Sequence, residues 1–148
     1  MVPSRGRWCA ALGVALTATT VSLYWSIFNG WIPCELCWIE RLCIYPLVLV
    51  CLLGLFLPKT ARRLAAPLLA GGVAVSLYHS LLQWRAAAAP VLICSPNASC
   101  AVPEFVYFHA VTPAFCALVA FCVIAALLFA PAPMGLTSGR VRRERGTA

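Results

Sequence analysis

Apolar residues are grouped along the chain into four long runs, and most polar residues stand between these runs. The runs cover residues 8–28, 38–57, 64–84 and 106–130. A helix needs about 20 predominantly apolar residues to cross a hydrocarbon core of about 30 Å. Each run is long enough for one crossing, so the pattern predicts four membrane-spanning helices. We expect one domain, residues 1–148, that ends in a basic cytoplasmic tail at 131–148.

The composition supports a lipid environment for these helices. Hydrophobic residues make up 63% of the 148 residues, charged residues make up 10%, and the mean hydropathy is +0.92. A chain with so few charges cannot cover an ordinary water-soluble surface. We predict an all-α polytopic membrane protein, a four-transmembrane-helix bundle in a lipid bilayer. Pro46 and Pro113 stand inside the second and fourth runs and are expected to kink those helices.

The basic residues are distributed unevenly between the connections, and this asymmetry predicts the orientation. In a chain of four spans, the three basic regions share one side, which the positive-inside rule makes cytoplasmic. Both termini are then cytoplasmic, and only Arg41 and Arg85 belong to the other side. A net charge of +7 could also indicate nucleic acid, but we expect no such partner because the charge follows membrane topology. The basic regions contain Arg5, Arg7, Lys59, Arg62, Arg63, Arg140, Arg142, Arg143 and Arg145.

Two cysteine pairs stand on the external side of this topology. Cys34 and Cys37 form a CxxC motif in the first external connection, and Cys94 and Cys100 lie in the second. Disulfides persist on this side of a membrane. The CxxC spacing allows a Cys34–Cys37 disulfide, and turn residues between Cys94 and Cys100 favour a second one. A thiol at the start of a helix can have a lowered pKa, so the CxxC motif indicates redox chemistry.

Two other interpretations of these cysteines are possible. The four thiols could ligate zinc, but we expect no metal, because an oxidising compartment favours disulfides and the second spacing is wide for a zinc knuckle. Both disulfides could be purely structural, although a CxxC disulfide closes a very short loop and adds little stability. The cysteines inside the spans are expected to behave as small apolar side chains. They are Cys9, Cys43, Cys51, Cys116 and Cys122.

Several ionisable residues near the membrane suggest functional hypotheses. Arg41 lies one helical turn below Cys37 on the same face, so it could polarise a bound electron acceptor. Alternatively, it reaches the headgroups or pairs with Glu40, which we expect to balance charge. His109 could bond a quinone oxygen, accept a proton or satisfy a helix end. His79 is expected to make a hydrogen bond between helices.

The run PCELCW at 33–38, followed by Arg41 and the Tyr45-Pro46 pair, resembles the signature of the DsbB/BdbC family of disulfide bond formation proteins. The similarity extends over nearly the whole chain and includes four spans, a CxxC motif at the head of the second, an external cysteine pair before the fourth and a proline inside the fourth. The short interval from Cys94 to Cys100 is similar to the BdbC branch. Because this loop differs from the long loop of other members, the resemblance does not define partner specificity.

The resemblance implies a protein-disulfide oxidoreductase of a prokaryotic cytoplasmic (inner) membrane. Such an enzyme is a quinone-dependent thiol oxidase that reoxidises an extracytoplasmic thioredoxin-fold partner similar to DsbA or BdbD. Cys94 would form a mixed disulfide with the partner, and Cys100 would help resolve it. The Cys34–Cys37 disulfide would then be reduced, and Cys37 as a thiolate would pass electrons to ubiquinone or menaquinone held near Arg41. The sequence does not distinguish the two quinones.

Two rival functions remain at this point. A vitamin K epoxide reductase-like protein also couples thiols to a quinone, but its quinone-side CxxC motif comes late in the chain, whereas here it comes early. A non-enzymatic membrane protein with four spans could use both disulfides to fasten external loops. In that case a Cys37→Ser substitution would leave thiol oxidation unchanged.

Overall fold

The computed structural model describes residues 3–30, 32–85, 100 and 112–131, and every regular element in these residues is an α-helix. Three of the predicted runs correspond closely to helices α1 (Arg5–Ile27), α2 (Glu35–Gly54) and α3 (Pro58–Trp84). The fourth helix, α4, covers Pro113–Phe129. The predicted all-α class and the four helices are therefore confirmed.

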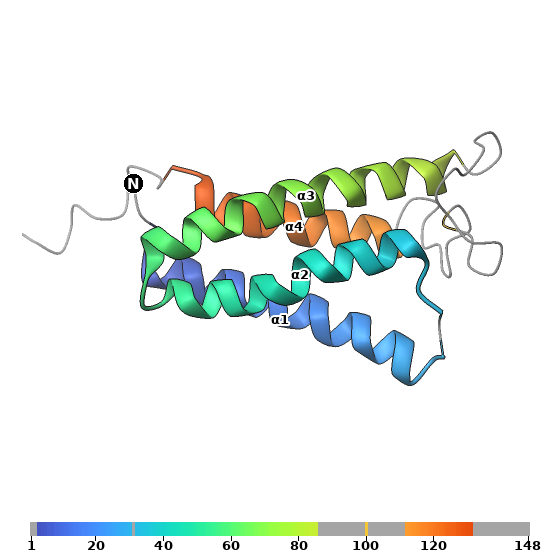
Figure 1. Ribbon diagram of the computed structural model, residues 1–148, viewed down its shortest axis with the longest axis horizontal. Helices are drawn as coiled ribbons and strands as arrows, with labels where there is room; N and C mark the ends of the chain where they lie inside the picture. The colour runs from blue at the N-terminus through green and yellow to red at the C-terminus, as the bar shows by residue number, and fades with distance from the viewer. Residues whose placement is uncertain (1–2, 31, 86–99, 101–111, 132–148) are drawn as a thin grey trace, which may run out of the picture.

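The four helices form a bundle in which neighbours along the chain run in opposite directions (Figure 1). Helix α1 packs against α2 and α4, and α3 packs against the same two helices from the other side. Helices α1 and α3 consequently occupy opposite corners. This arrangement brings the start of α2, the end of α3 and the start of α4 to one end of the bundle, the right-hand end in Figure 1.

Close packing on glycine holds the helices together at the opposite end and near the middle of the bundle. The indole ring of Trp8 lies directly over Gly54 at the opposite end, and the ring of Phe121 lies over Gly72 near the middle of α3 and α4, so a Cβ atom at either glycine would overlap an aromatic ring. Both aromatic side chains are almost fully buried. Small residues allow membrane helices to approach closely in this way. Arg7 adds hydrogen bonds to the carbonyls of Ala126 and Ala130, which ties α1 to the last turn of α4.

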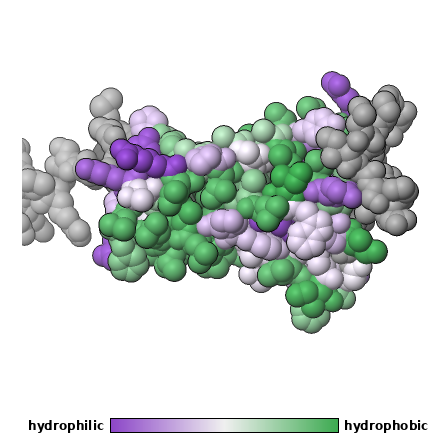
Figure 2. All heavy atoms as spheres, in the orientation of Figure 1, coloured by the Kyte–Doolittle hydropathy of each residue, from purple (hydrophilic) through white to green (hydrophobic). Residues whose placement is uncertain are grey.

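The outer surface of the bundle is apolar, as a lipid environment requires. Large side chains such as Leu42 and Leu49 are 67% and 69% exposed. Figure 2 shows hydrophobic residues across the middle of one face, with the largest hydrophilic group towards the end where α1 begins and smaller hydrophilic groups at the other end. Helices α1, α2 and α3 are long and apolar enough to span a membrane, and α4 has 17 residues, the lower limit of the usual range of about 17–25. The side of the membrane on which the termini lie stays a prediction.

The two prolines expected to kink helices have different roles. Pro46 lies inside α2, and Figure 1 shows this helix changing direction about halfway along. For Pro113 the prediction was wrong, because this residue begins α4, where a missing N–H group costs nothing. The hydroxyl of Thr112 caps the helix by accepting a hydrogen bond from the backbone N–H of Phe115 at 3.3 Å. The described helix therefore starts at 113, while residues 106–111 of the predicted span lie outside the described residues.

Candidate redox site

The CxxC motif forms the first turn of α2. Cys34 is the N-cap residue, and its sulfur accepts a hydrogen bond from the backbone N–H of Cys37 at 3.4 Å. Both cysteines are thiols in the structure, with their Sγ atoms 2.9 Å apart. Cys34 is buried and Cys37 is partly exposed. The predicted position at a helix start is thus confirmed, and the predicted Cys34–Cys37 disulfide stays a prediction.

The surroundings of Cys34 favour an anionic sulfur. The pKa of Cys34 is lowered to about 4, mainly by the hydrogen bond from the Cys37 thiol, although burial acts in the opposite direction. His79 and the backbone N–H of Cys37 contribute to the same lowering. The start of α2 adds the positive end of a helix dipole. Cys34 is therefore a thiolate at neutral pH when the pair is reduced, and the Cys37 thiol carries the proton.

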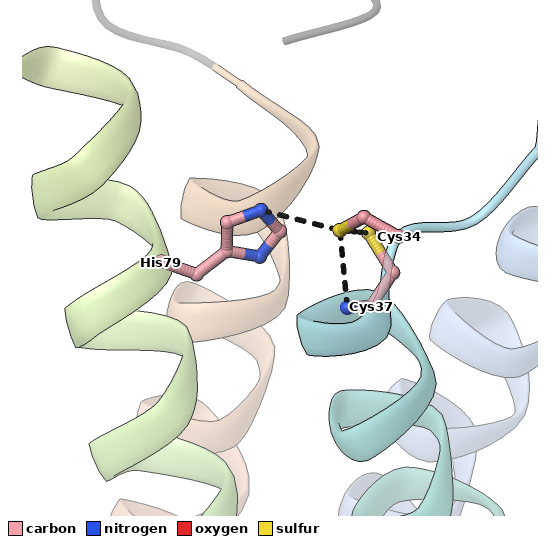
Figure 3. Close-up of side chains that lie close together, drawn as sticks. All are labelled: Cys34, Cys37 and His79. Atoms are coloured by element: carbon pink, nitrogen blue, oxygen red, sulfur yellow. Dashed lines mark hydrogen bonds between the residues drawn. The ribbon is translucent and has the colours of Figure 1, made fainter. Parts of the chain in front are cut away.

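A buried histidine from α3 joins the two cysteines (Figure 3). His79 is 1% exposed, and its Nε2 atom lies 3.8 Å from the sulfur of Cys34. On the other side of the ring, Nδ1 lies 3.0 Å from Oε1 of Glu40, which is also buried. The side-chain amide of Gln83 lies 3.2 Å from Nε2. The predicted hydrogen bond from His79 to another helix is confirmed, but its proximity to Cys34 was missed.

Arg41 is held by α1 and does not pair with Glu40. Its Nε atom donates to the hydroxyl of Ser22 at 2.9 Å, and its Nη2 atom donates to the Ser22 carbonyl at 3.1 Å and to the hydroxyl of Ser26 at 2.6 Å. The guanidinium carbon also lies 5.5 Å from the centre of the Trp38 ring. These contacts fix the side chain inside the bundle, so the alternative in which Arg41 pairs with Glu40 is wrong.

A cavity of about 1220 Å³ lies between α1, α2 and α4, beside the cysteine pair. It exceeds the common range of about 300–1,000 Å³ for small-molecule sites, and its wall is mainly apolar. Polar groups meet it mostly at the end that holds the CxxC motif. The polar or redox-active residues at this end are Ser22, Ser26, Cys34, Cys37, Glu40, Arg41 and Gln83.

Cys100 is disulfide-bonded and buried, and it belongs to the same buried cluster as Cys34. Leu36 and Leu82 complete this cluster, and Cys37 packs against it. An outer disulfide is thus adjacent to the inner pair. The predicted site residues Cys94 and His109 lie outside the described residues.

The other described cysteines are free thiols. Cys9, Cys116 and Cys122 are exposed on the helices, Cys43 is partly buried and Cys51 is fully buried. Cys116 also borders the cavity at the start of α4. Within the described residues, Cys34, Cys37 and His79 form a group in which two sulfurs and a ring nitrogen lie close enough to contact one ion.

Comparison with known proteins gives a consistent result. The family model described as "Disulfide bond formation protein DsbB" matches residues 4–138. Disulfide bond formation protein C of Bacillus subtilis is 35% identical over 112 residues, which cover 75% of this chain and 81% of that protein. Probable disulfide formation protein C 1 of Bacillus anthracis is 35% identical over 122 residues, which cover 80% and 86% of the two chains. No solved structure shows a significant match.

Proposed function

The chain belongs to the DsbB family of disulfide bond formation proteins, and from this premise we propose that it is a quinone-dependent thiol oxidase. In this proposal it reoxidises an extracytoplasmic thioredoxin-fold thiol oxidase and passes the electrons to a membrane quinone. The main supporting observation is that the reactive dithiol and Arg41 border one apolar cavity between the helices. Family membership also favours this function over the vitamin K epoxide reductase-like alternative.

The electrons enter through the outer cysteine pair. A reduced partner transfers two electrons to the Cys94–Cys100 disulfide, so the partner gains a disulfide and the outer pair becomes two thiols. The Cys100 thiolate then attacks Cys34 of the inner disulfide and releases Cys37. Attack of Cys94 on Cys100 restores the outer disulfide and leaves the inner pair reduced. The shared buried cluster of Cys34 and Cys100 supports this route, because exchange requires the sulfurs to meet.

The proton on the inner pair changes place during these steps. In the reduced pair, Cys37 donates its proton towards the Cys34 thiolate. While Cys34 is bonded to Cys100, it has no anionic sulfur to accept that hydrogen bond. Cys37 can then act as the thiolate that faces the cavity, as the family resemblance implies. Because Cys37 leaves the inner disulfide as a thiolate, the proton that the reduced pair later carries has to be supplied, and His79 and Glu40 lie close enough to Cys34 to hold it.

A quinone supplies an acceptor for two electrons and two protons, and the residues around the cavity fit this substrate. The Arg41 guanidinium would orient a quinone oxygen and stabilise negative charge on it. Ser22 and Ser26 keep the guanidinium in position. The apolar wall along α1 and α4 would exclude water and accommodate part of an isoprenoid tail.

Redox energetics favour a membrane quinone over a soluble thiol couple. If the partner has a potential of about −120 mV, a glutathione-like pool at roughly −200 mV lies about 80 mV below it. Oxidation by such a pool would be uphill by nearly 4 kcal/mol, at about 1.4 kcal/mol per 30 mV. The acceptor must therefore be more oxidising. We place the enzyme in a prokaryotic cytoplasmic membrane, with both termini cytoplasmic and the cysteine pairs on the extracytoplasmic side.

Anaerobic mixing of the oxidised protein with excess reduced partner and quinone tests this function, with quinone absorbance as the readout. We expect the wild type to reduce quinone and the Cys37→Ser variant to lose the reaction. Cys43→Ser is the matched control, because it removes a thiol from the same helix outside the site and should retain activity. If the folded wild type reduces no quinone in the presence of a verified partner, the structural role of the disulfides becomes the better explanation.

A further inference from the structure

We propose that the reduced Cys34–Cys37 pair and His79 form a binding site for a thiophilic divalent cation, Zn²⁺ or Cd²⁺, which blocks reoxidation of the pair. This site differs from a structural zinc site built on four cysteines, because it exists only after the inner disulfide has been reduced. The inhibitory effect rests on the proposed function, since it requires the reduced pair to occur during turnover. Binding of the ion itself does not depend on a quinone or on a partner protein.

The ligand atoms of Cys34 and His79 are already separated as they would be in a tetrahedral metal site, and the Cys37 sulfur lies close to both. The two sulfurs and one imidazole nitrogen all lie within 4.8 Å of one another. The distance of 3.8 Å from the Cys34 sulfur to Nε2 of His79 is long for a strong hydrogen bond. It is close to the separation of about 3.6 Å between sulfur and nitrogen ligands on a tetrahedral zinc with ordinary bond lengths. A thiolate pair and an imidazole are ligands that zinc and cadmium prefer.

One sulfur has to move to complete the site. The sulfurs of Cys34 and Cys37 are 2.9 Å apart, whereas two thiolates on one tetrahedral zinc lie about 3.8 Å apart. Cys37 is partly exposed and borders the cavity, so its side chain has room to rotate away from Cys34. Metal binding displaces the proton carried by the Cys37 thiol and changes no oxidation state.

The residues behind His79 support its role as a ligand. Glu40 lies 3.0 Å from Nδ1, which fixes the ring and keeps Nε2 directed towards the cysteines. A carboxylate in this position is the usual partner of a metal-bound histidine. Gln83 now contacts Nε2 through its amide nitrogen and would have to turn away. Its Oε1 atom is buried without a hydrogen-bond partner, so it can accept a hydrogen bond from water that fills the fourth position on the metal.

Binding of Cd²⁺ to the full-length protein in lipid nanodiscs tests the proposal through the near-ultraviolet absorbance of cadmium–thiolate bonds. We expect the reduced wild type to bind one ion per chain at this site and the oxidised protein to show no such absorbance. His79→Gln should weaken binding at least tenfold, because it removes one ligand of three. Glu40→Gln should weaken binding by about tenfold or more, since partners of metal ligands contribute about 10- to 100-fold to affinity.

Cys43→Ser is the control for cysteines outside the site and should bind like the wild type. Equal binding by the oxidised and reduced forms, or unchanged affinity in both His79→Gln and Glu40→Gln, would overturn the proposal. If His79→Gln fails to insert, the Glu40→Gln variant carries the test. Because neither quinone nor partner is present, a negative binding result leaves the proposed oxidase function standing, and failure of quinone reduction leaves the binding result unaffected.

Discussion

The two ends of the bundle are built differently. At the end where α1 begins, the Trp8 ring packs directly on Gly54, so α1 and α2 lie close together. At the end that holds the cysteines, α1 and α2 separate (Figure 1), and a cavity of about 1220 Å³ occupies the space between α1, α2 and α4. Buried Glu40 and His79 hydrogen-bond to each other at this end. One end of the molecule is therefore specialised for packing and the other for chemistry.

This difference has an energetic basis. A buried, hydrogen-bonded polar pair is often no more stabilising than apolar residues of similar size, whereas removing one partner is costly. A chain under selection for stability alone would gain little from a histidine–glutamate pair inside its spans. Their position beside Cys34 supplies a reason for them. Substitutions at the two ends should consequently change different properties, and the following predictions test this separation.

The largest effect is expected from Glu40→Gln, which changes charge and hardly alters shape. We expect the rate of quinone reduction to fall by about 10²-fold, within the usual range of about 10²–10⁴ for loss of positioned acid–base chemistry. The glutamine oxygen can still accept a hydrogen bond from His79, so the unfolding midpoint should change little. Single-turnover quinone reduction and thermal unfolding measure the two properties. A large loss of stability at unchanged rate would assign Glu40 to the packing of the bundle.

A substitution at the packed end should lower the stability of the protein and leave its activity unchanged. In Gly54→Ala, the new methyl group meets the Trp8 ring, and overpacking of this kind costs about 1–3 kcal/mol. The free energy of unfolding should fall by that amount, while activity per folded molecule is retained. Gly13→Ala is the matched control, since no atom lies within 4 Å of its added Cβ. Equal free energies of unfolding for the two variants would contradict the close contact between the Trp8 ring and Gly54.

The serines that hold Arg41 should have an intermediate effect on quinone binding. Ser26→Ala removes the hydrogen bond of 2.6 Å to the guanidinium, and a hydrogen bond to a charged group contributes about 1.5–3 kcal/mol. We expect the KM for quinone to rise about tenfold, with the KM for the partner protein unchanged. Steady-state kinetics with each substrate varied in turn measure the two constants. A change in the KM for the partner alone would remove Ser26 from the quinone site.

The sequence predicted the parts of this arrangement that depend on local pattern. Long apolar runs indicated the helices, and the CxxC motif followed by Arg41 placed thiols and a cation within the first two turns of α2. The contacts of Arg41 with Ser22 and of Glu40 with His79 join different helices, so they depend on how the helices rotate against one another. Hydrophobic periodicity carries little of that information when lipid surrounds the bundle on all sides. A useful sequence signal was nonetheless present, because ionisable residues inside apolar spans are uncommon.

The smallest expected effect is that of pH on the rate at which Cys34 is alkylated, which should be nearly constant between pH 7 and pH 5. Because the pKa of Cys34 is lowered to about 4, its thiolate is fully formed at pH 7 and still about nine-tenths formed at pH 5. The rate of alkylation of Cys34 in the reduced protein should therefore hardly change between these values and should fall only as the pH drops through about 4. A thiol with an ordinary pKa of about 8.5 should lose about 10²-fold over the same interval, and a cysteine-containing reference peptide added to the sample provides this comparison. Mass spectrometry of the alkylated peptides separates the two thiols. If Cys34 slows in parallel with the reference peptide, its sulfur is not a thiolate at neutral pH, and Cys34 at the start of α2 lacks the activation that distinguishes the cysteine end of the bundle from the packed end.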